Sequence, residues 1–132
     1  MCGRGVTGLR AVRVERAARA EEALEVEPVE RGAEATAARI RERVGERKAY
    51  LTFDIDCLDP SCAPGTGTPV NGGPSTVWAR RVFAAMHGIN FVGMDVVEVA
   101  PAYDVGEVTS LAAATLIYDY LCLLSKDMPD VV

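Results

Sequence analysis

The chain has 132 residues, 49 % hydrophobic and 25 % charged, which is typical of one folded domain and excludes a disordered protein. Its formal net charge of −5 argues against nucleic acid as a partner. Residues 1–48 hold 11 of the 14 basic and 9 of the 19 acidic residues, so residues 49–132 are acidic. An acidic half favours metal cations or a cationic substrate, although several of these acids are expected to be ordinary solvated surface groups.

The four cysteines indicate a reducing environment. Cys2, Cys57, Cys62 and Cys122 form no CxxC pair and no zinc-finger spacing, so we interpret them as free thiols. The N-terminus has no apolar signal segment, and no run reaches the roughly 20 apolar residues that cross a bilayer. We therefore expect a cytoplasmic protein that does not associate with membranes.

The first third of the chain carries weak structural signals. Residues 9–14 predict a short strand, residues 16–24 a helical piece, and residues 24–29 a short strand or loop. Apolar residues then recur at helical spacing from Ala33 to Val44, and Gly45 ends that helix.

Stronger signals follow after residue 48. They predict a strand over Ala49–Asp56, a helix from Ser75 or Thr76 to about His87, a strand over Ile89–Val99, a helix over Val108–Leu124 and a loose tail over Lys126–Val132. Both strands are almost wholly apolar, which is typical of strands buried on both faces of a parallel sheet. The alternation predicts an α/β fold with helices on both faces of a parallel sheet, in which these two strands are neighbours.

Three aspartates stand at the end of the first of these strands, in Tyr50–Thr68, YLTFDIDCLDPSCAPGTGT. Alternation along the strand puts Asp54 and Asp56 on one face, about 6–7 Å apart, where their carboxylates can converge on a metal pair. Open α/β sheets place their sites at this carboxyl end. The alternative is that one aspartate caps the turn and the other is solvated. Asp59 precedes Pro60, which favours a turn role for it.

The second strand ends in the same manner, with Asp95 and Glu98 followed by Pro101, Tyr103 and Asp104. Glu98 alone would most often be a paired or surface carboxylate. Two strands that both carry acids at their carboxyl ends indicate a site more strongly than one.

Other candidate residues carry weaker signals. His87 is the only histidine, and its place near a helix C-terminus favours a helix-end role over metal ligation. The segment 65–68, GTGT, lacks the Lys of a phosphate-binding loop and is interpreted as a shaped turn near the site. Cys57 and Cys62 flank the aspartates but do not suit a hard metal. Trp78 is expected in the core or an interface.

Three segments together resemble a known family: YLTFDIDCLDPSCAPGTGTPVNGG, GINFVGMDVVEVAPAYD and VTSLAAATLIYDYL. They are similar to the C-terminal part of the ureohydrolases, which include arginase, agmatinase, guanidinobutyrase and formimidoylglutamase, and most of all to agmatinases. The resemblance runs from Tyr50 to about Leu124, is weaker over residues 16–48, and leaves residues 1–15 unassigned. It implies that residues 1–132 are the C-terminal part of one three-layer α/β/α domain with a mainly parallel sheet, here incomplete.

The resemblance also implies a site and a reaction. Family members hold two manganese ions, so Asp54 would bridge the two metals, Asp56 would bind one, and Glu98 would meet the guanidinium of a small cationic substrate. The implied reaction is hydrolysis of agmatine to putrescine and urea. The family's remaining ligands, a histidine and an Asp-Ala-His-x-Asp segment, are absent from this sequence. We therefore expect this chain alone to be inactive.

Other interpretations remain open. The chain could be a non-catalytic truncated ureohydrolase that acts only as an interaction module, as a homo-oligomer or with a full-length subunit. It could also follow another ureohydrolase in its substrate, such as guanidinobutyrase or arginase. A phosphatase of the haloacid-dehalogenase type also places a DxD after a strand. That class is disfavoured because Leu58 stands where its motif requires Thr or Val.

Overall fold

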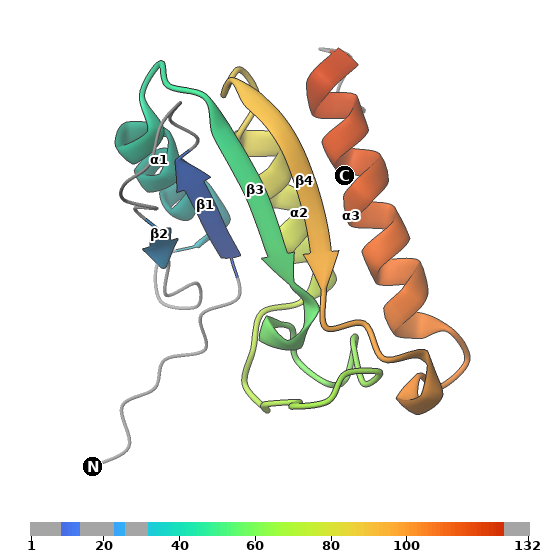
Figure 1. Cartoon of the computed structure of the whole chain (residues 1–132). Helices are drawn as coiled ribbons and strands as arrows, with labels where there is room; N and C mark the ends of the chain where they lie inside the picture. The colour runs from blue at the N-terminus through green and yellow to red at the C-terminus, as the bar shows by residue number, and fades with distance from the viewer. Residues whose placement is uncertain (1–8, 14–22, 26–31, 126–132) are drawn as a thin grey trace.

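The structure is a computed structural model that describes residues 9–13, 23–25 and 32–125 (Figure 1). Its elements are β1 (Leu9–Arg13), β2 (Ala23–Glu25), α1 (Ala33–Val44), β3 (Ala49–Asp54), η1 (Ile55–Cys57), α2 (Thr76–Ala85), β4 (Phe91–Val97), η2 (Pro101–Tyr103) and α3 (Val108–Ser125). The helical piece predicted over 16–24 is wrong at its end, because residues 23–25 form a strand. Its remainder and the predicted tail at 126–132 lie outside the described residues.

The four strands form one sheet in the order β2-β1-β3-β4. Strands β3 and β4 are parallel neighbours, as predicted, with partners that run from Ala49↔Phe91 to Asp54↔Val97. Strand β1 is antiparallel to both β2 and β3, so the described sheet contains one parallel pair and two antiparallel pairs. The parallel pair brings the carboxyl ends of β3 and β4 to the same edge.

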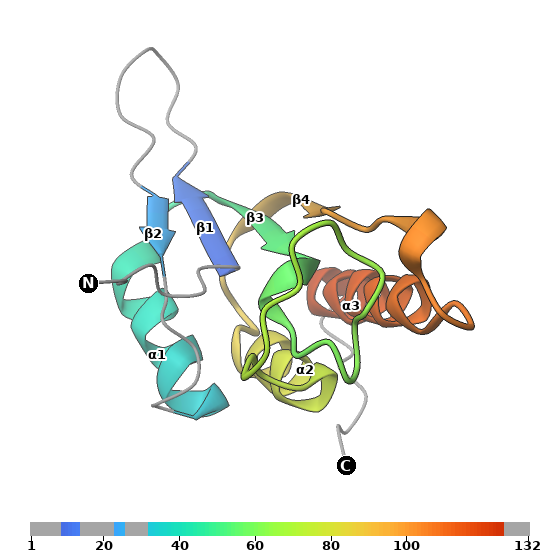
Figure 2. The same cartoon turned by 90° about the horizontal axis from the view of Figure 1, so that it is seen from below.

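All three described helices lie on one face of the sheet, where α2 sits between α1 and α3 and packs against both (Figure 2). Among the described residues, no helix covers the second face of the sheet, so the predicted helices on both faces are not found there. Outward side chains of β4 such as Asp95 and Val97 are exposed, so the prediction that this strand is buried on both faces is wrong. One helical layer and the sheet make an α/β fold that is incomplete, as expected.

Strand β3 is fixed by the core beneath it. Its side chains alternate between buried and half-buried, and Leu51 and Phe53 are fully buried. The ring of Phe53 meets that of Phe83 on α2 edge to face, with 5.8 Å between the centroids, and Ile40 of α1 is also fully buried. Each such side chain contributes about 1.5–3 kcal/mol by burial, so the end of β3 is held in a defined position.

Local hydrogen bonds set the ends of α2. The hydroxyl of Ser75 accepts a hydrogen bond from the backbone N of Trp78, as the sequence predicts for a capping residue. The helix ends at Ala85, two residues before the predicted end at His87. Arg41 of α1 donates from Nη2 to the carbonyls of both residues, at 2.6 and 2.7 Å. This cation satisfies carbonyl groups at the helix C-terminus.

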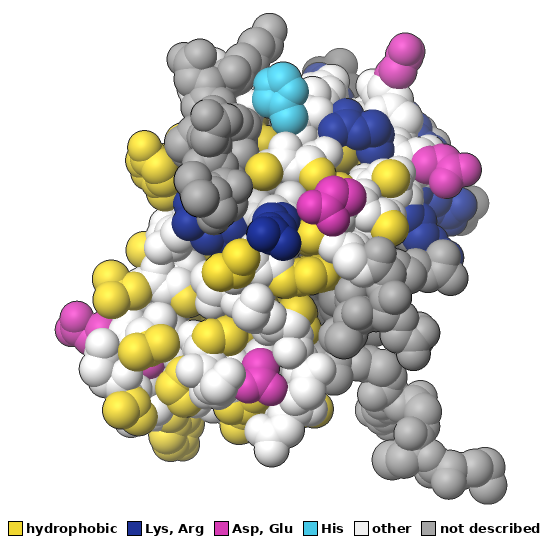
Figure 3. Space-filling model, turned by 180° about the vertical axis from the view of Figure 1, so that it is seen from behind, with side chains coloured by type: hydrophobic (Ala, Val, Ile, Leu, Met, Phe, Trp, Pro, Cys, Tyr) yellow, Lys and Arg dark blue, Asp and Glu magenta, His cyan; other side chains and the backbone are white. Residues whose placement is uncertain are grey.

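Helix α3 has two different faces. Its length and composition alone would suit a membrane-crossing helix, but residues such as Thr109, Ala112, Leu116 and Tyr120 are buried against the rest of the chain. It packs on α2 and β4, as a core helix does. Its other face exposes large apolar side chains: Leu111, Ile117, Tyr118, Leu121 and Leu124. In the view of the helical layer in Figure 3, hydrophobic side chains are frequent on the α3 side, whereas Lys and Arg lie mainly across the upper half of the molecule.

Candidate functional site

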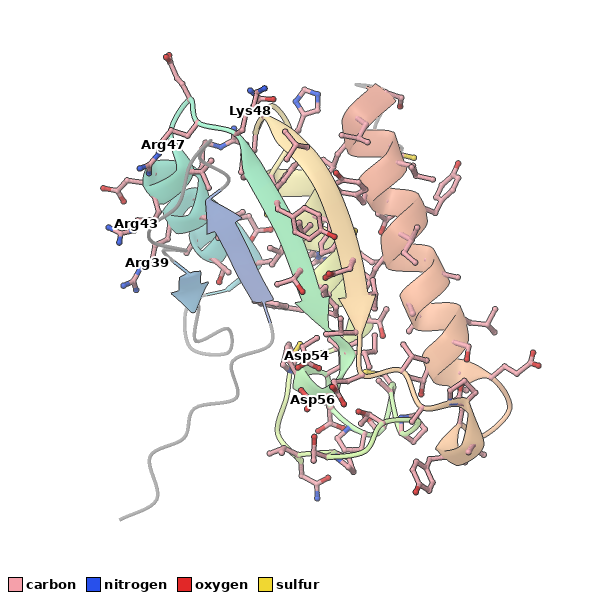
Figure 4. All side chains as sticks on the ribbon, in the orientation of Figure 1. Arg39, Arg43, Arg47, Lys48, Asp54 and Asp56 are labelled. Atoms are coloured by element: carbon pink, nitrogen blue, oxygen red, sulfur yellow. The ribbon has the colours of Figure 1, made fainter. Side chains whose placement is uncertain are left out.

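Asp54 and Asp56 lie together at the carboxyl end of β3 (Figure 4). The strand ends at Asp54, and Asp56 lies in the turn η1, so the prediction that both share one strand face is wrong. The backbone N of Asp56 donates to Oδ1 of Asp54 at 3.2 Å. Asp54 therefore caps the turn, as the alternative interpretation proposed, and this cap brings the two carboxylates close to each other.

Segment 65–68 supplies a partner for the second carboxylate. The hydroxyl of Thr68 donates to Oδ2 of Asp56 at 2.7 Å. The prediction that this segment forms a turn near the site is confirmed. The sequence carries no signal for this particular hydrogen bond, because it joins residues 12 positions apart through an irregular loop.

Glu98 follows β4 directly and lies beside the same edge. Its neighbour Val97 is the partner of Asp54 in the parallel pair. Its backbone has a φ of 65°, in the left-handed region, which costs a non-glycine residue about 1–2 kcal/mol. Such strain persists where the surroundings impose it, and it is enriched at functional sites. Nothing in the sequence indicates this conformation.

The electrostatic environment reflects the gathered acids. The pKa of Asp54 is raised to about 6, and the largest cause is partial burial of its carboxylate. The hydrogen bond from the backbone of Asp56 opposes this rise, whereas the negative charges of Asp56 and Glu98 add to it. Burial, together with the negative charges of Asp54 and Asp56, raises the pKa of the Cys57 thiol to about 12. The thiol is therefore protonated at neutral pH, which agrees with its exclusion as a metal ligand.

The donor set fits part of a divalent-cation site. Carboxylate oxygens suit a hard or borderline cation such as Mn²⁺, and a cation would offset both the burial and the repulsion that raise the Asp54 pKa. Among the residues that the structure describes, no group of three or more His, Cys, Asp or Glu side chains could hold a metal ion. Two carboxylates are too few for a complete site, because affinity depends on ligand number and preformed geometry.

The other candidates have structural roles or lie elsewhere. Asp59 accepts hydrogen bonds from the backbone N of Ser61 and of Gly72, at 2.9 and 2.8 Å, so its predicted turn role is confirmed. Asp95 accepts a hydrogen bond from the hydroxyl of Tyr50 at 3.3 Å. His87 precedes the amino end of β4, at the opposite end of the parallel pair from Asp54.

The indole, the thiols and the basic side chains lie apart from the two carboxylates or have other surroundings. Trp78 is half-buried against the core, and its indole nitrogen is buried without a hydrogen-bond partner. Cys57, Cys62 and Cys122 carry free thiols, whereas Cys2 lies outside the described residues. The basic residues labelled on and after α1 in Figure 4 lie away from the aspartates, as the charge distribution along the chain suggested.

Acids at the carboxyl ends of two adjacent parallel strands are typical of α/β enzymes that bind their ligands at this edge. A model of the arginase family matches residues 5–122. The chain therefore belongs to the arginase family, as its resemblance to ureohydrolases implied.

The similarity to individual relatives covers only part of the length of each relative. The chain is 55 % identical over 93 residues to the agmatinase of Chromobacterium violaceum, a match that covers 70 % of this chain and 29 % of the relative. It superimposes on the crystal structure of a hypothetical agmatinase from Burkholderia thailandensis with a TM-score of 0.71 and 58 % identity, covering 74 % and 31 % of the two chains. For proclavaminate amidino hydrolase from Streptomyces clavuligerus the TM-score is 0.73, the identity 40 % and the coverage 76 % and 34 %. The chain thus spans about a third of the length of these relatives.

Proposed function

We propose that this chain is the C-terminal part of a single agmatinase-like domain and carries part of its manganese and substrate site. The observation that carries the proposal is the gathering of Asp54, Asp56 and Glu98 where β3 and β4 end side by side. The similarity to agmatinases at 54–58 % identity supports the choice of substrate. The corresponding reaction is hydrolysis of agmatine to putrescine and urea in the cytoplasm.

Each acidic residue has a distinct role in this proposal. Asp54 and Asp56 would hold two Mn²⁺ ions together with ligands from outside this chain. When bound, Mn²⁺ supplies hydroxide near neutral pH. Glu98 accepts a charge-assisted pair from the substrate guanidinium and orients its carbon. Its imposed backbone conformation would fix the direction in which this carboxylate leaves the chain.

The test is Mn²⁺ binding to the 132-residue chain, measured by calorimetry beside Asp54→Asn/Asp56→Asn. The double variant Glu42→Gln/Glu46→Gln is a matched control, because it removes the same charge from exposed positions on and after α1. We expect weak binding that the site variant loses and the control keeps. Equal binding by all three proteins would refute the metal site.

Activity is tested separately by urea release from agmatine, arginine and 4-guanidinobutyrate with Mn²⁺ present. We expect no turnover by the chain alone, because two carboxylates cannot complete the site. Turnover by the chain would contradict its assignment as part of a site. If there is turnover, faster hydrolysis of arginine or 4-guanidinobutyrate than of agmatine would assign the chain to another ureohydrolase activity.

A second candidate function is that of a non-catalytic assembly module. The exposed apolar face of α3, with Leu111, Ile117, Tyr118, Leu121 and Leu124, favours it, since monomers rarely expose large contiguous apolar patches. Sedimentation of the chain, alone and mixed with a full-length agmatinase, would test it. Association that is unaffected by Asp54→Asn/Asp56→Asn would support an assembly role, whereas a monomer in both samples would exclude it.

A further inference from the structure

We propose that Thr68 is a positioning residue for Asp56, an inference that rests on the proposed metal site. Its hydroxyl lies 2.7 Å from Oδ2 of Asp56 and donates a hydrogen bond to it. A donor to one carboxylate oxygen fixes the plane of the carboxylate and leaves the other oxygen for a further partner. Groups of this kind orient metal ligands in protein sites generally.

An exposed threonine can hold a carboxylate in place only if its own loop is held. That loop is anchored at Gly65, whose backbone N donates to the hydroxyl of the fully buried Thr109 at 2.7 Å. The carbonyl of Gly65 accepts a hydrogen bond from the backbone N of Ala100 at 2.8 Å. Segment 65–68 is therefore tied both to the chain after β4 and to the first turn of α3.

Close packing tightens this anchor. A Cβ atom at Gly65 would lie 2.7 Å from Cβ of Asp104 and 2.8 Å from its Cα, so no larger residue fits without displacing the backbone. Thr66, the next residue, is also buried. Gly65 and Thr66 are therefore held in place, and only the exposed Gly67 separates this anchor from Thr68.

The Thr68 hydroxyl adds a second connection, besides the pairing of β3 with β4, between two pieces of the site. One piece is the turn with Asp54 and Asp56 after β3, and the other is the segment after β4 that begins at Glu98. Without the hydroxyl, both pieces would keep their folds, but the Asp56 side chain would be free to rotate. Thr68→Val removes the hydroxyl donor and keeps the shape of the side chain, whereas Thr68→Ser keeps a hydroxyl donor.

The experiment measures the χ1 rotamer of Asp56 by three-bond NMR couplings in the metal-free chain, and then Mn²⁺-induced line broadening at the Asp56 amide. We expect one rotamer in the wild type and in Thr68→Ser, and averaged couplings in Thr68→Val. We expect the Mn²⁺ concentration for half-maximal broadening to rise about tenfold in Thr68→Val only. Thr115→Val is the matched control, since it removes a hydroxyl that donates to Leu111 O on the exposed side of α3.

A single Asp56 rotamer in Thr68→Val, equal to that of the wild type, would overturn the proposal. Averaged couplings in both Thr68→Val and Thr68→Ser would also overturn it, because the effect would then come from the loop and not from the hydroxyl. The proposed function fails separately: no broadening at Asp56 in any protein would count against the metal site, whatever the couplings show.

Discussion

Arg80 of α2 and Asp119 of α3 form a two-point ion pair inside the helical layer. Arg80 Nε lies 2.8 Å from Oδ2 of Asp119, and its Nη2 lies 3.2 Å from Oδ1. The Asp119 side chain is fully buried, whereas 34 % of the Arg80 side chain is exposed. The pair therefore explains how an otherwise apolar helix carries a buried carboxylate, and it fixes α3 against α2.

We predict that Arg80→Met lowers the free energy of unfolding by about 3 kcal/mol, because the Asp119 carboxylate is left buried without its partner. This loss lies at the lower end of the usual range for breaking a buried ion pair, because water can approach Asp119 from the exposed part of residue 80. Guanidinium chloride denaturation measures the change. Arg81→Met, at an exposed neighbouring position, is the control and should change stability little.

The double variant Arg80→Met/Asp119→Leu separates the loss of the pair from the cost of the orphaned charge. We expect it to recover at least half of the lost stability, since apolar replacements of buried pairs are often neutral or stabilising. If the double variant were less stable than the single one, the ion pair itself would be the main source of stability.

Asp104 holds the start of α3. Its Oδ1 accepts a hydrogen bond from the backbone N of Thr109, and its Oδ2 accepts from the backbone N and the hydroxyl of Ser110, all within 2.9 Å. Burial raises the pKa of Asp104, but these hydrogen bonds outweigh it and bring the pKa to about 2. A lowered pKa means that ionised Asp104 stabilises the folded chain.

We predict that Asp104→Asn lowers the melting temperature by roughly 5 °C at pH 6, because Asn offers only one acceptor oxygen. The stabilisation by the charge is present above the unfolded value near 3.8 and is lost as the pH falls through about 2. The difference between the two proteins should therefore narrow between pH 4 and pH 2, as measured by circular dichroism. A constant difference over this range would exclude the charge as its cause.

The elements that pack into the core were predictable from the sequence. Helix α1 ends at Val44 before Gly45, which has a φ of 60°, and β3 and β4 are neighbours as expected. The end of β3 was not predictable, because Ile55 continues the alternation of buried residues while it already belongs to the turn. The alternation of buried side chains therefore continues from the strand into the turn, although the backbone conformation changes.

The sequence indicates candidate residues for a site but not how the structure arranges them. The acids at two strand ends indicated Asp54, Asp56 and Glu98. The cap between the aspartates, the donor at Thr68 and the left-handed backbone of Glu98 depend on contacts between distant segments. Local sequence patterns carry no information on such contacts, because the same loop residues can adopt many conformations.

We predict that Asp54→Asn stabilises the metal-free chain at neutral pH. The pKa of Asp54 is raised from 3.8 to about 6, so the folded state is favoured by its protonated form, and this contribution is lost as the pH rises through about 6. After allowance for solvent screening, the gain at pH 7.5 is about 1 kcal/mol. Thermal unfolding in the presence of a chelator should show this gain at pH 7.5 and none at pH 3.5. The same gain from Glu42→Gln would show that net charge alone causes it.

Backbone strain and substrate binding at Glu98 can be separated by glycine substitutions. Glu98 and Glu107 both have left-handed backbones, with φ of 65° and 61°, but only Glu98 belongs to the candidate site. Glycine adopts this conformation without a steric penalty, at the cost of greater freedom in the unfolded chain. We therefore expect Glu98→Gly and Glu107→Gly each to raise the free energy of unfolding by about 0.5–1 kcal/mol.

Agmatine binding should distinguish the two glycine variants. NMR shift changes on titration with agmatine should weaken in Glu98→Gly, because the carboxylate proposed to accept the guanidinium is gone, and should persist in Glu107→Gly. Stabilisation of both variants with loss of binding in Glu98→Gly alone would mean that the chain bears backbone strain at this position to present a substrate-binding carboxylate. Equal binding by both variants would leave the strain at Glu98 without a role in substrate recognition.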